Sequence, residues 1–447
     1  MSQNQQSTQA QRGIASLIAI LEEDQENLDN INRQLSQNSD SDEESIEESP
    51  CPILDRYLEE TGNESIKKIT GFYYQEIGMI YDPIELDVSS KWLDGRGKKP
   101  EVTPKDAFFM MLTVFKAYST WDIHAEAFGM HYTTFQKTVM KILKIVTPLL
   151  AANHIHKPDM EKLDSNKQTF VNFPYALYAT DVKFQQSYRP RVSHEEAKVY
   201  FSGKHKLYGL KVEFSVTPDG QCVDFTKHYP GSVHDLTICR KNKNAHKTML
   251  RKKTHEHTME DDGELYNEYK NYWAMLTDKG YIGLKHELRA IYPTKKPNKG
   301  HLPRQEKIRN KEVSSDRSLI ERYFGRMNLL WGIMAKQYRW AEEIYDSVVT
   351  ICVALTNFHI TLNPLNVQDE EYYKTIMAKL RAIGKHMYKK RKDCQKKYRQ
   401  RQKLRRQMME NEIPIRPNYS EDEQEDMEEA AEDDGSQASQ VLLENDE

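Results

Sequence analysis

Two aspartates occupy the same local setting, each at the end of a short apolar segment that is typical of a buried strand. Asp181 ends the run Ala-Leu-Tyr-Ala-Thr-Asp, and Asp278 ends Trp-Ala-Met-Leu-Thr-Asp. If the two strands are neighbours in one sheet, the carboxylates meet, and like charges at close range are costly unless a cation lies between them. Mg²⁺ and Mn²⁺ prefer such oxygen ligands. The pair therefore predicts a divalent-metal site, whereas a turn or helix N-cap is the alternative for either aspartate alone.

A third acid, Glu321, lies in the predicted helix Arg317-Ser-Leu-Ile-Glu-Arg-Tyr-Phe-Gly-Arg-Met. Arg317 precedes it by four residues, which is also the spacing of an ordinary surface ion pair. Gly325 is harder to explain, since a glycine inside a helix costs about 1 kcal/mol relative to alanine. We expect a backbone or a phosphate to approach closely there, so this face of the helix is predicted to be functional.

A fourth acid, Asp235, ends the segment His-Tyr-Pro-Gly-Ser-Val-His-Asp, where a turn leads into a helix. N-capping explains an acid at this position adequately. A place beside the metal ions is the alternative.

The elements around these acids change along the chain from helices to strands and back to helices. Residues 174–226 have the alternation of strands, and a further short strand leads to Asp278. Long helices are predicted from about residue 314 to 360. This order is typical of an α/β domain whose strands present the acids.

Residues 101–150 precede the strands and have a helical pattern. Thr103-Pro104 is a cap followed by a first-turn proline, and a later short helix ends at Gly129. A third helix starts at Tyr132 and has one apolar and one basic face. This arrangement predicts a helix-turn-helix, with an ordinary helical bundle as the alternative. The basic side chains expected to face DNA are Lys137, Lys141 and Lys144.

Charge is strongly segregated along the chain. Residues 1–50 hold eleven acids and two bases, and residues 421–447 hold thirteen acids and no base. Because the whole chain has a net charge of −4 and these ends have −9 and −13, residues 51–420 carry about +18. Such a basic centre indicates a polyanionic partner, of which nucleic acid is the commonest. The acidic ends either compete for that surface or serve only solubility.

A last, highly charged helix is predicted over residues 369–412. Between Lys385 and Arg406 there are twelve Lys or Arg and one acid, with few apolar positions to bury. The segment therefore indicates a nuclear-localisation or DNA-backbone patch and not a core element. Its basic residues include Lys389, Lys390, Arg391, Lys392, Arg405 and Arg406.

Several classes of protein are disfavoured by composition. The five cysteines are scattered without a Cys-x-x-Cys pair, which argues against a disulfide framework and a cysteine-built zinc site. No stretch approaches the roughly 20 apolar residues of a membrane span, and the N-terminus lacks the pattern of a signal peptide. We therefore expect a reducing, intracellular compartment and no membrane contact.

Around the four acids the sequence resembles the DDE superfamily endonucleases of the PIF/Harbinger transposon group. Five blocks match in family order over about residues 174–360, and segment 101–150 resembles the family's helix-turn-helix. One departure is Val182, which stands where the family usually has glycine and so puts a side chain beside the first metal ligand. The blocks are Thr180-Asp181 with Arg189-Pro190, Phe201 to Lys211, Tyr229 to Asp235, Asp278 to Tyr281, and Arg317 to Arg326.

The resemblance implies an α/β, RNase H-like catalytic core, a mixed sheet flanked by helices. Asp181 on the first strand, Asp278 after the fourth strand and Glu321 on a following helix would be the catalytic metal ligands. Asp235 would be an accessory, or would replace Asp278 as the second ligand. Two Mg²⁺ or Mn²⁺ ions would support phosphoryl transfer on DNA. Lys204 and Lys206 would position phosphates, a solvated charge cluster being the alternative.

The expected protein is thus a DDE-type transposase or endonuclease that cuts and joins DNA in a nucleus. It is expected to be a homo-oligomer, with a separate DNA-binding protein as a further partner. A domesticated DNA-binding or regulatory protein without transposition activity is the alternative, and no RNA-binding module is recognisable. The expected parts are a disordered acidic tail (1–50), an unassigned linker (51–100), a helix-turn-helix domain (101–150), the nuclease domain (174–360), a basic helix (369–412) and a disordered acidic tail (413–447).

Overall fold

The computed structural model describes residues 49–94, 99–297 and 300–410. The tails predicted to be disordered, 1–50 and 413–447, lie outside these residues except for Ser49 and Pro50. The described residues from Cys51 onward belong to one compact unit.

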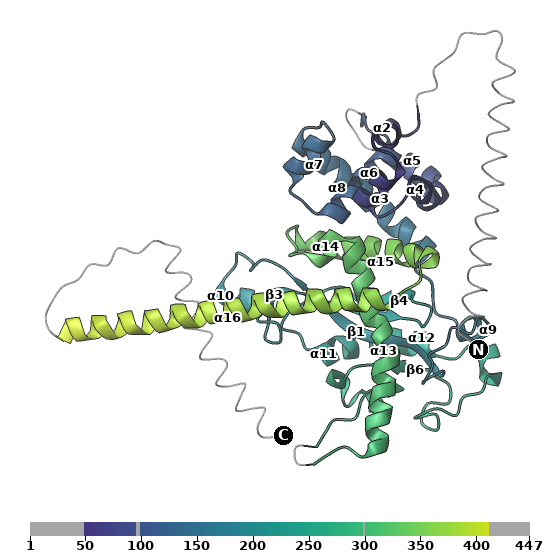
Figure 1. Ribbon diagram of the computed structural model, residues 1–447, viewed down its shortest axis with the longest axis vertical. Helices are drawn as coiled ribbons and strands as arrows, with labels where there is room; N and C mark the ends of the chain where they lie inside the picture. Colours follow the sequence, from purple (N-terminus) through teal and green to yellow (C-terminus); the bar gives the residue numbers. More distant parts are fainter. Residues whose placement is uncertain (1–48, 95–98, 298–299, 411–447) are drawn as a thin grey trace, which may run out of the picture. The chain divides into compact units, whose positions relative to one another are not determined.

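A seven-stranded mixed sheet organises the second half of this unit (Figure 1). Its main path is β2-β3-β1-β6-β7, and β4 and β5 both pair with β3. β1 is antiparallel to β3 and parallel to β6, and β6 is parallel to β7. The strands are β1 (Ala176–Gln186), β2 (Phe201–Ser202), β3 (Leu207–Val216), β4 (Cys222–Phe225), β5 (Tyr229–Pro230), β6 (Ala274–Leu276) and β7 (Ala290–Ile291).

The predicted strands and the mixed sheet flanked by helices are confirmed. β1 begins as an uninterrupted buried run, as expected for a strand that is covered on both faces. Phe214 of β3 packs edge to face on Phe324 at a ring distance of 5.4 Å, which identifies the face covered by helix α13 (Arg304–Leu330). The opposite face bears α11 (Asp235–Lys241) and α12 (Lys243–Leu250).

The region before the sheet is helical throughout. Residues 51–100, which were given no role from sequence, contain four α-helices that pack around α6 and α8. The three helices predicted between 101 and 150 are confirmed, with Thr103 accepting a hydrogen bond from Asp106 N and Gly129 in the left-handed region. The helices are α2 (Pro52–Thr61), α3 (Asn63–Thr70), α4 (Tyr74–Tyr81), α5 (Glu85–Trp92), α6 (Pro104–Ala117), α7 (Trp121–Ala127) and α8 (Tyr132–His154).

Two further helices join this helical region to the sheet. The short α14 (Gly332–Ala335) contacts α6, and α15 (Tyr345–Leu362) packs along α8. The segment Glu342–Leu362 is long and apolar enough to cross a membrane, but it is mostly buried inside the protein. It is therefore a core helix of this fold. The remaining α-helices are α9 (Met160–Ser165) and α10 (His194–Lys198).

The predicted C-terminal helix is confirmed as α16 (Val367–Glu410), which begins against α13 (Figure 1). A Cβ on Gly325 would lie only 1.8 Å from the carbonyl oxygen of Asp369, so this glycine admits the backbone of α16. The next residue, Arg326, forms a buried ion pair with Asp369 at 2.7 Å. The close approach expected at Gly325 is thus a helix-helix contact.

Farther along, α16 crosses the β2–β3 turn. A Cβ on Gly384 would meet the carbonyl oxygen of His205 at 2.2 Å, and the Arg391 guanidinium lies 4.6 Å from the Phe201 ring centroid. The sequence pattern predicted that this helix has little to bury. The prediction is wrong at Arg391, whose side chain is half-buried against Phe201. Most other basic residues of this helix are exposed, as the pattern indicated.

The contact at Gly325 gives a prediction about stability. Gly325→Ala should destabilise the protein by about 1–3 kcal/mol, the usual cost of overpacking, because the Asp369 backbone has no flexible end to move. Denaturant unfolding measures this, and limited proteolysis should release α16 sooner. Gly203→Ala is the matched control, since nothing lies within 4 Å of a Cβ there. Equal stabilities for Gly325→Ala and the wild type would contradict this role.

Candidate active site

Asp181 lies on β1 and points to the face of the sheet that α13 covers. It is paired in register with Phe214, so the two side chains share this face. Its Oδ1 accepts a hydrogen bond from Val182 N at 2.8 Å, and its Oδ2 accepts one from Arg317 Nη1 at 3.3 Å. Burial raises the pKa of Asp181 to about 6, although the Arg317 guanidinium opposes this shift. A half-buried carboxylate beside other acids favours a bound cation.

Arg317 links two of the predicted ligands. Its Nη2 donates to Glu321 Oε1 at 3.1 Å, one helical turn along α13, while Nη1 reaches Asp181 on the sheet. The Arg317 side chain is only 14% exposed, and its Nε has no hydrogen-bond partner among the described residues. The pair is therefore not an ordinary surface ion pair, because the same guanidinium neutralises a carboxylate on another element.

Asp278 reaches the same place from the strand beside β1. It follows β6, whose residue Leu276 pairs with Ala179 of β1. It occupies the N-cap position of a short 3₁₀ helix, Lys279–Tyr281, but makes no capping hydrogen bond with its side chain. The negative charge of Asp278 raises both the pKa of Asp181 and that of Arg317. The structure thus brings Asp181, Asp278 and Glu321 around one guanidinium.

Val182 does not crowd this site. Successive residues of a strand point to opposite faces, and Val182 pairs in register with Glu213 on the face away from α13. The expectation that its side chain narrows the space beside Asp181 is therefore not met.

Asp235 has a different environment on the other face of the sheet. Its carboxylate accepts hydrogen bonds from Lys211 Nζ at 3.0 Å and Lys204 Nζ at 3.4 Å. Burial alone would raise the pKa of Asp235, but these two lysines lower it. The N-cap of α11 is His234, whose ring accepts from Leu236 N, so N-capping does not explain Asp235. With two cationic partners already present, Asp235 has less need of a metal ion than Asp278.

The lysines predicted to contact DNA fall into two groups. Lys204, Lys137 and Lys144 are exposed, whereas Lys141 donates to the carbonyl oxygen of Trp92 at 2.5 Å and so helps to pack α8 on α5. The ammonium of Lys206 lies 5.5 Å from the centre of the Tyr388 ring on α16. Of the six basic residues of α16 singled out from the sequence, all but Arg391 are exposed, namely Lys389, Lys390, Lys392, Arg405 and Arg406.

Sequence reasoning did not find the part of α16 that borders the site. Tyr373 is half-buried, and besides burial the charges of Asp181 and Glu321 raise the pKa of its hydroxyl. Its ring lies 5.5 Å from that of Phe324 on α13. No local pattern signals this contact, because it depends on how α16 docks.

The acids fit hard divalent cations by their chemistry. Asp181, Asp278 and Glu321 offer carboxylate oxygens, and the one side chain seen to bridge them is a cation, Arg317. Among the described residues, the three do not form a group whose oxygens all lie within 4.8 Å of one another. Separation is consistent with mutual repulsion, and ions shared by all three would require the carboxylates to close in and Arg317 to move.

Comparisons with known proteins agree with this geometry. Residues 178–357 match the family described as DDE superfamily endonuclease, a segment that contains all four acids. The chain is also similar to the "Probable transposase for insertion sequence element IS702" of Microchaete diplosiphon, with 22% identity over 298 residues, 66% of this chain and 94% of that protein. No solved structure matches. These similarities support a DDE-type endonuclease or transposase function, while the narrower PIF/Harbinger assignment stays a prediction.

The position of Arg317 predicts how metal ions affect stability. Arg317→Met should leave the three carboxylates without their cation, and Mn²⁺ should then raise the melting temperature more than it does for the wild type. Thermal unfolding with and without Mn²⁺ measures the difference. The matched control is Arg322→Met, which removes an ion pair of α13 with Glu370 outside this cluster. An equal Mn²⁺ effect in all three proteins would show that the acids do not share a cation.

Proposed function

We propose that this protein is a DDE-type transposase or endonuclease that cleaves and joins DNA phosphodiesters at Asp181, Asp278 and Glu321. The observation that carries the proposal is the Arg317 guanidinium, which bridges Asp181 and Glu321 while the charge of Asp278 acts on it. Three acids from two neighbouring strands and a helix thus converge on one cation. We propose that this domain has the RNase H-like arrangement, with β1 and β6 as the strands that present the aspartates.

Mg²⁺ or Mn²⁺ would be held by these three carboxylates, and two such ions would supply a nucleophilic hydroxide and neutralise charge on the scissile phosphate. The protein's own part is to hold the acids in place. β1 fixes Asp181 through its pairing with β3, and α13 fixes Glu321 through its buried side. Arg317 then serves as a resident counter-charge that keeps the acids together.

We further propose that Lys204 positions a phosphate beside the acids. It is exposed, it reaches Asp235 at 3.4 Å, and its charge also lowers the pKa of Asp181. The charge of Lys204 therefore acts on Asp235 and also on Asp181, which lie on opposite faces of the sheet. Asp235 acts here as the partner that orients Lys204 and Lys211, and not as a metal ligand.

DNA binding outside the acids is assigned to two surfaces as proposals. One is the helix-turn-helix of α7 and α8, with Lys137 and Lys144 toward the duplex. The other is the exposed part of α16, whose Lys389, Lys390 and Lys392 suit a phosphate backbone or a nuclear-import receptor. We propose a nuclear location on this ground, together with a homo-oligomer and a separate DNA-binding partner protein.

A domesticated protein without transposition activity is the second reading of the same domain. It predicts DNA binding without cleavage, whereas the observed cluster keeps all three acids and their arginine together. The cluster favours the enzyme.

The assignment of ligands predicts the effects of three substitutions. Asp181→Ala and Asp278→Ala should each reduce Mn²⁺-dependent nicking of supercoiled plasmid by about 100-fold or more, because each removes a ligand. Asp235→Ala should leave measurable nicking, since its carboxylate is held by lysines. Circular dichroism controls for folding. If nicking survives Asp278→Ala but not Asp235→Ala, the second ligand is Asp235 and this assignment is wrong.

The helix-turn-helix proposal predicts a change in salt dependence. Replacing Lys137 and Lys144 with alanine should weaken DNA binding and reduce the slope of log affinity against log salt by about 1.8, or 0.9 for each lost phosphate contact. Lys141 is left intact because it packs α8 on α5. The double variant Lys68→Ala and Lys91→Ala removes two exposed helical lysines of the same region as a control. Equal slopes for both variants and the wild type would return this segment to an ordinary helical bundle.

A further inference from the structure

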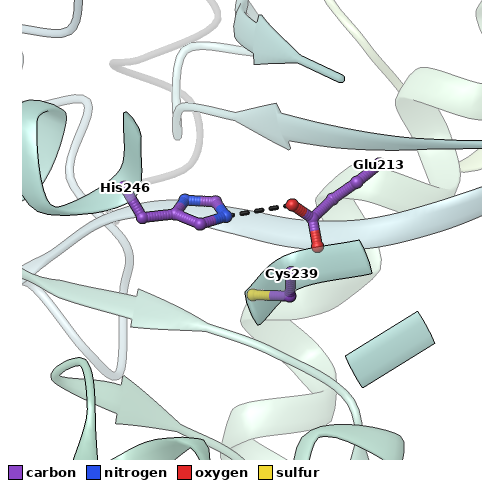
Figure 2. Close-up of side chains that lie close together, drawn as sticks. All are labelled: Glu213, Cys239 and His246. Atoms are coloured by element: carbon purple, nitrogen blue, oxygen red, sulfur yellow. Dashed lines mark hydrogen bonds and ion pairs between the residues drawn. The ribbon is translucent and has the colours of Figure 1, made fainter. Parts of the chain in front are cut away.

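Three buried side chains with metal-ligand chemistry meet on the face of the sheet opposite Asp181. They are Glu213 of β3, Cys239 of α11 and His246 of α12, drawn in Figure 2. Their donor atoms all lie within 4.8 Å of one another. All three residues are at most 1% exposed. The cluster is therefore enclosed by protein and is separate from the acidic site.

The Glu213 carboxylate is only partly satisfied in this enclosure. Its Oε1 lies 3.0 Å from His246 Nε2 and 3.4 Å from Asn242 Nδ2. Its Oε2 is buried and has no hydrogen-bond partner among the described residues. Leaving a buried carboxylate oxygen without a donor or a cation is energetically costly. Figure 2 shows the carboxylate directed at the His246 ring, with the Cys239 side chain beside it.

His246 is held in the manner of a metal-ligating histidine. Its Nδ1 lies 2.9 Å from the Tyr178 hydroxyl, which leaves Nε2 directed at Glu213. Histidine ligands usually donate their second ring nitrogen to such an oxygen, which fixes the tautomer and the ring orientation. If Nδ1 donates to Tyr178, the Nε2 lone pair and Glu213 Oε1 face each other and need a cation between them.

We propose that Glu213, Cys239 and His246 bind one structural Zn²⁺ ion. One sulfur, one imidazole nitrogen and one carboxylate oxygen form a ligand set typical of zinc and unlike the all-oxygen set that Mg²⁺ prefers. Binding releases the thiol proton to solvent, so that a thiolate and a carboxylate together balance the two positive charges. A water molecule would supply the fourth ligand that zinc favours.

The ion would link helices α11 and α12 to strand β3 of the sheet. β3 supplies Glu213, and the short helices α11 and α12 supply one ligand each. α11 starts at Asp235, the residue that holds Lys211 and Lys204, so the ion would fix the block that orients these lysines. The proposal is independent of the proposed DNA chemistry.

A hydrogen-bond network without a metal ion is the alternative for this cluster. In that case Tyr178 donates to His246 Nδ1, and His246 Nε2 donates to Glu213. This tautomer needs no metal, and the Cys239 thiol is then the donor that lies beside the Glu213 carboxylate. A metal analysis separates the two alternatives directly.

The test uses the full-length protein and two readouts. Elemental analysis after dialysis against Mg²⁺ should find about one zinc per chain, and Co²⁺ replacement should give a thiolate-to-cobalt charge-transfer band. Cys239→Ala and His246→Gln should lose both signals. Cys394→Ala, on α16, and Asp181→Ala, on the opposite face of the sheet, should keep them.

Wild-type measurements decide the outcome even if the cluster variants fail to fold. A zinc-selective chelator in excess Mg²⁺ should lower the melting temperature of the wild type, and added Zn²⁺ should restore it. Absence of bound zinc together with absence of the cobalt band in the wild type overturns the proposal in favour of the hydrogen-bond network. A cobalt band that persists in folded Cys239→Ala also overturns it, because the thiolate then comes from elsewhere.

Discussion

Repulsion among half-buried carboxylates is the constraint on which the sheet-containing half of this protein depends. Asp181 is half-buried, and burial raises its pKa to about 6, while the charge of Asp278 acts in the same direction. Without a cation, two carboxylates on neighbouring strands repel each other, and one of them tends to stay protonated. Arg317 supplies that cation from α13, at 3.3 Å from Asp181 and 3.1 Å from Glu321. The guanidinium can be placed there only if α13 lies close against β1.

The packing around α13 follows from this requirement. The helix is covered by the sheet on one side and by α16 on another, so that little of its middle is free. Gly325 lets the α16 backbone come close, and the buried pair of Arg326 and Asp369 fixes the contact. Both devices lie within two turns of Glu321. The start of α16 thus stabilises the helix that carries the third acid, and Tyr373 of α16 packs on Phe324 near enough for the charges of Asp181 and Glu321 to raise the pKa of its hydroxyl.

The sequence was sufficient to predict the parts of this site that have a local signal. An apolar run that leads to an aspartate indicated β1 and β6, and helical spacing indicated α13. The expected strand end is met at Asp278 but not at Asp181, since β1 continues to Gln186 and pairs with β3 along that length. The contacts that join these elements had no such signal. The i,i+4 spacing of Arg317 and Glu321 permits a surface pair, and only the tertiary structure shows the same guanidinium at Asp181. Likewise, the lysine partners of Asp235 come from β3 and from the β2–β3 turn, more than twenty residues earlier.

In the helical region, too, the sequence lacked a local signal for structure that depends on tertiary packing. Residues 51–100 had no clear periodicity over a long window, because their helices are short, from eight to ten residues, and depend on packing against α6 and α8. The mixed cluster of Glu213, Cys239 and His246 was also missed, since a search for cysteine pairs cannot detect one ligand from each of three elements.

The central claim is that Asp181, Asp278 and Glu321 bind the divalent ions. A crystal soaked in Mn²⁺ and measured at the manganese absorption edge tests it most directly. The account predicts anomalous peaks between these three carboxylates, with Arg317 displaced from its bridging position. Peaks at Asp235 would contradict the proposal. It would also be contradicted if saturating Mn²⁺ gave no peak beside the three carboxylates and Arg317 still bridged Asp181 and Glu321.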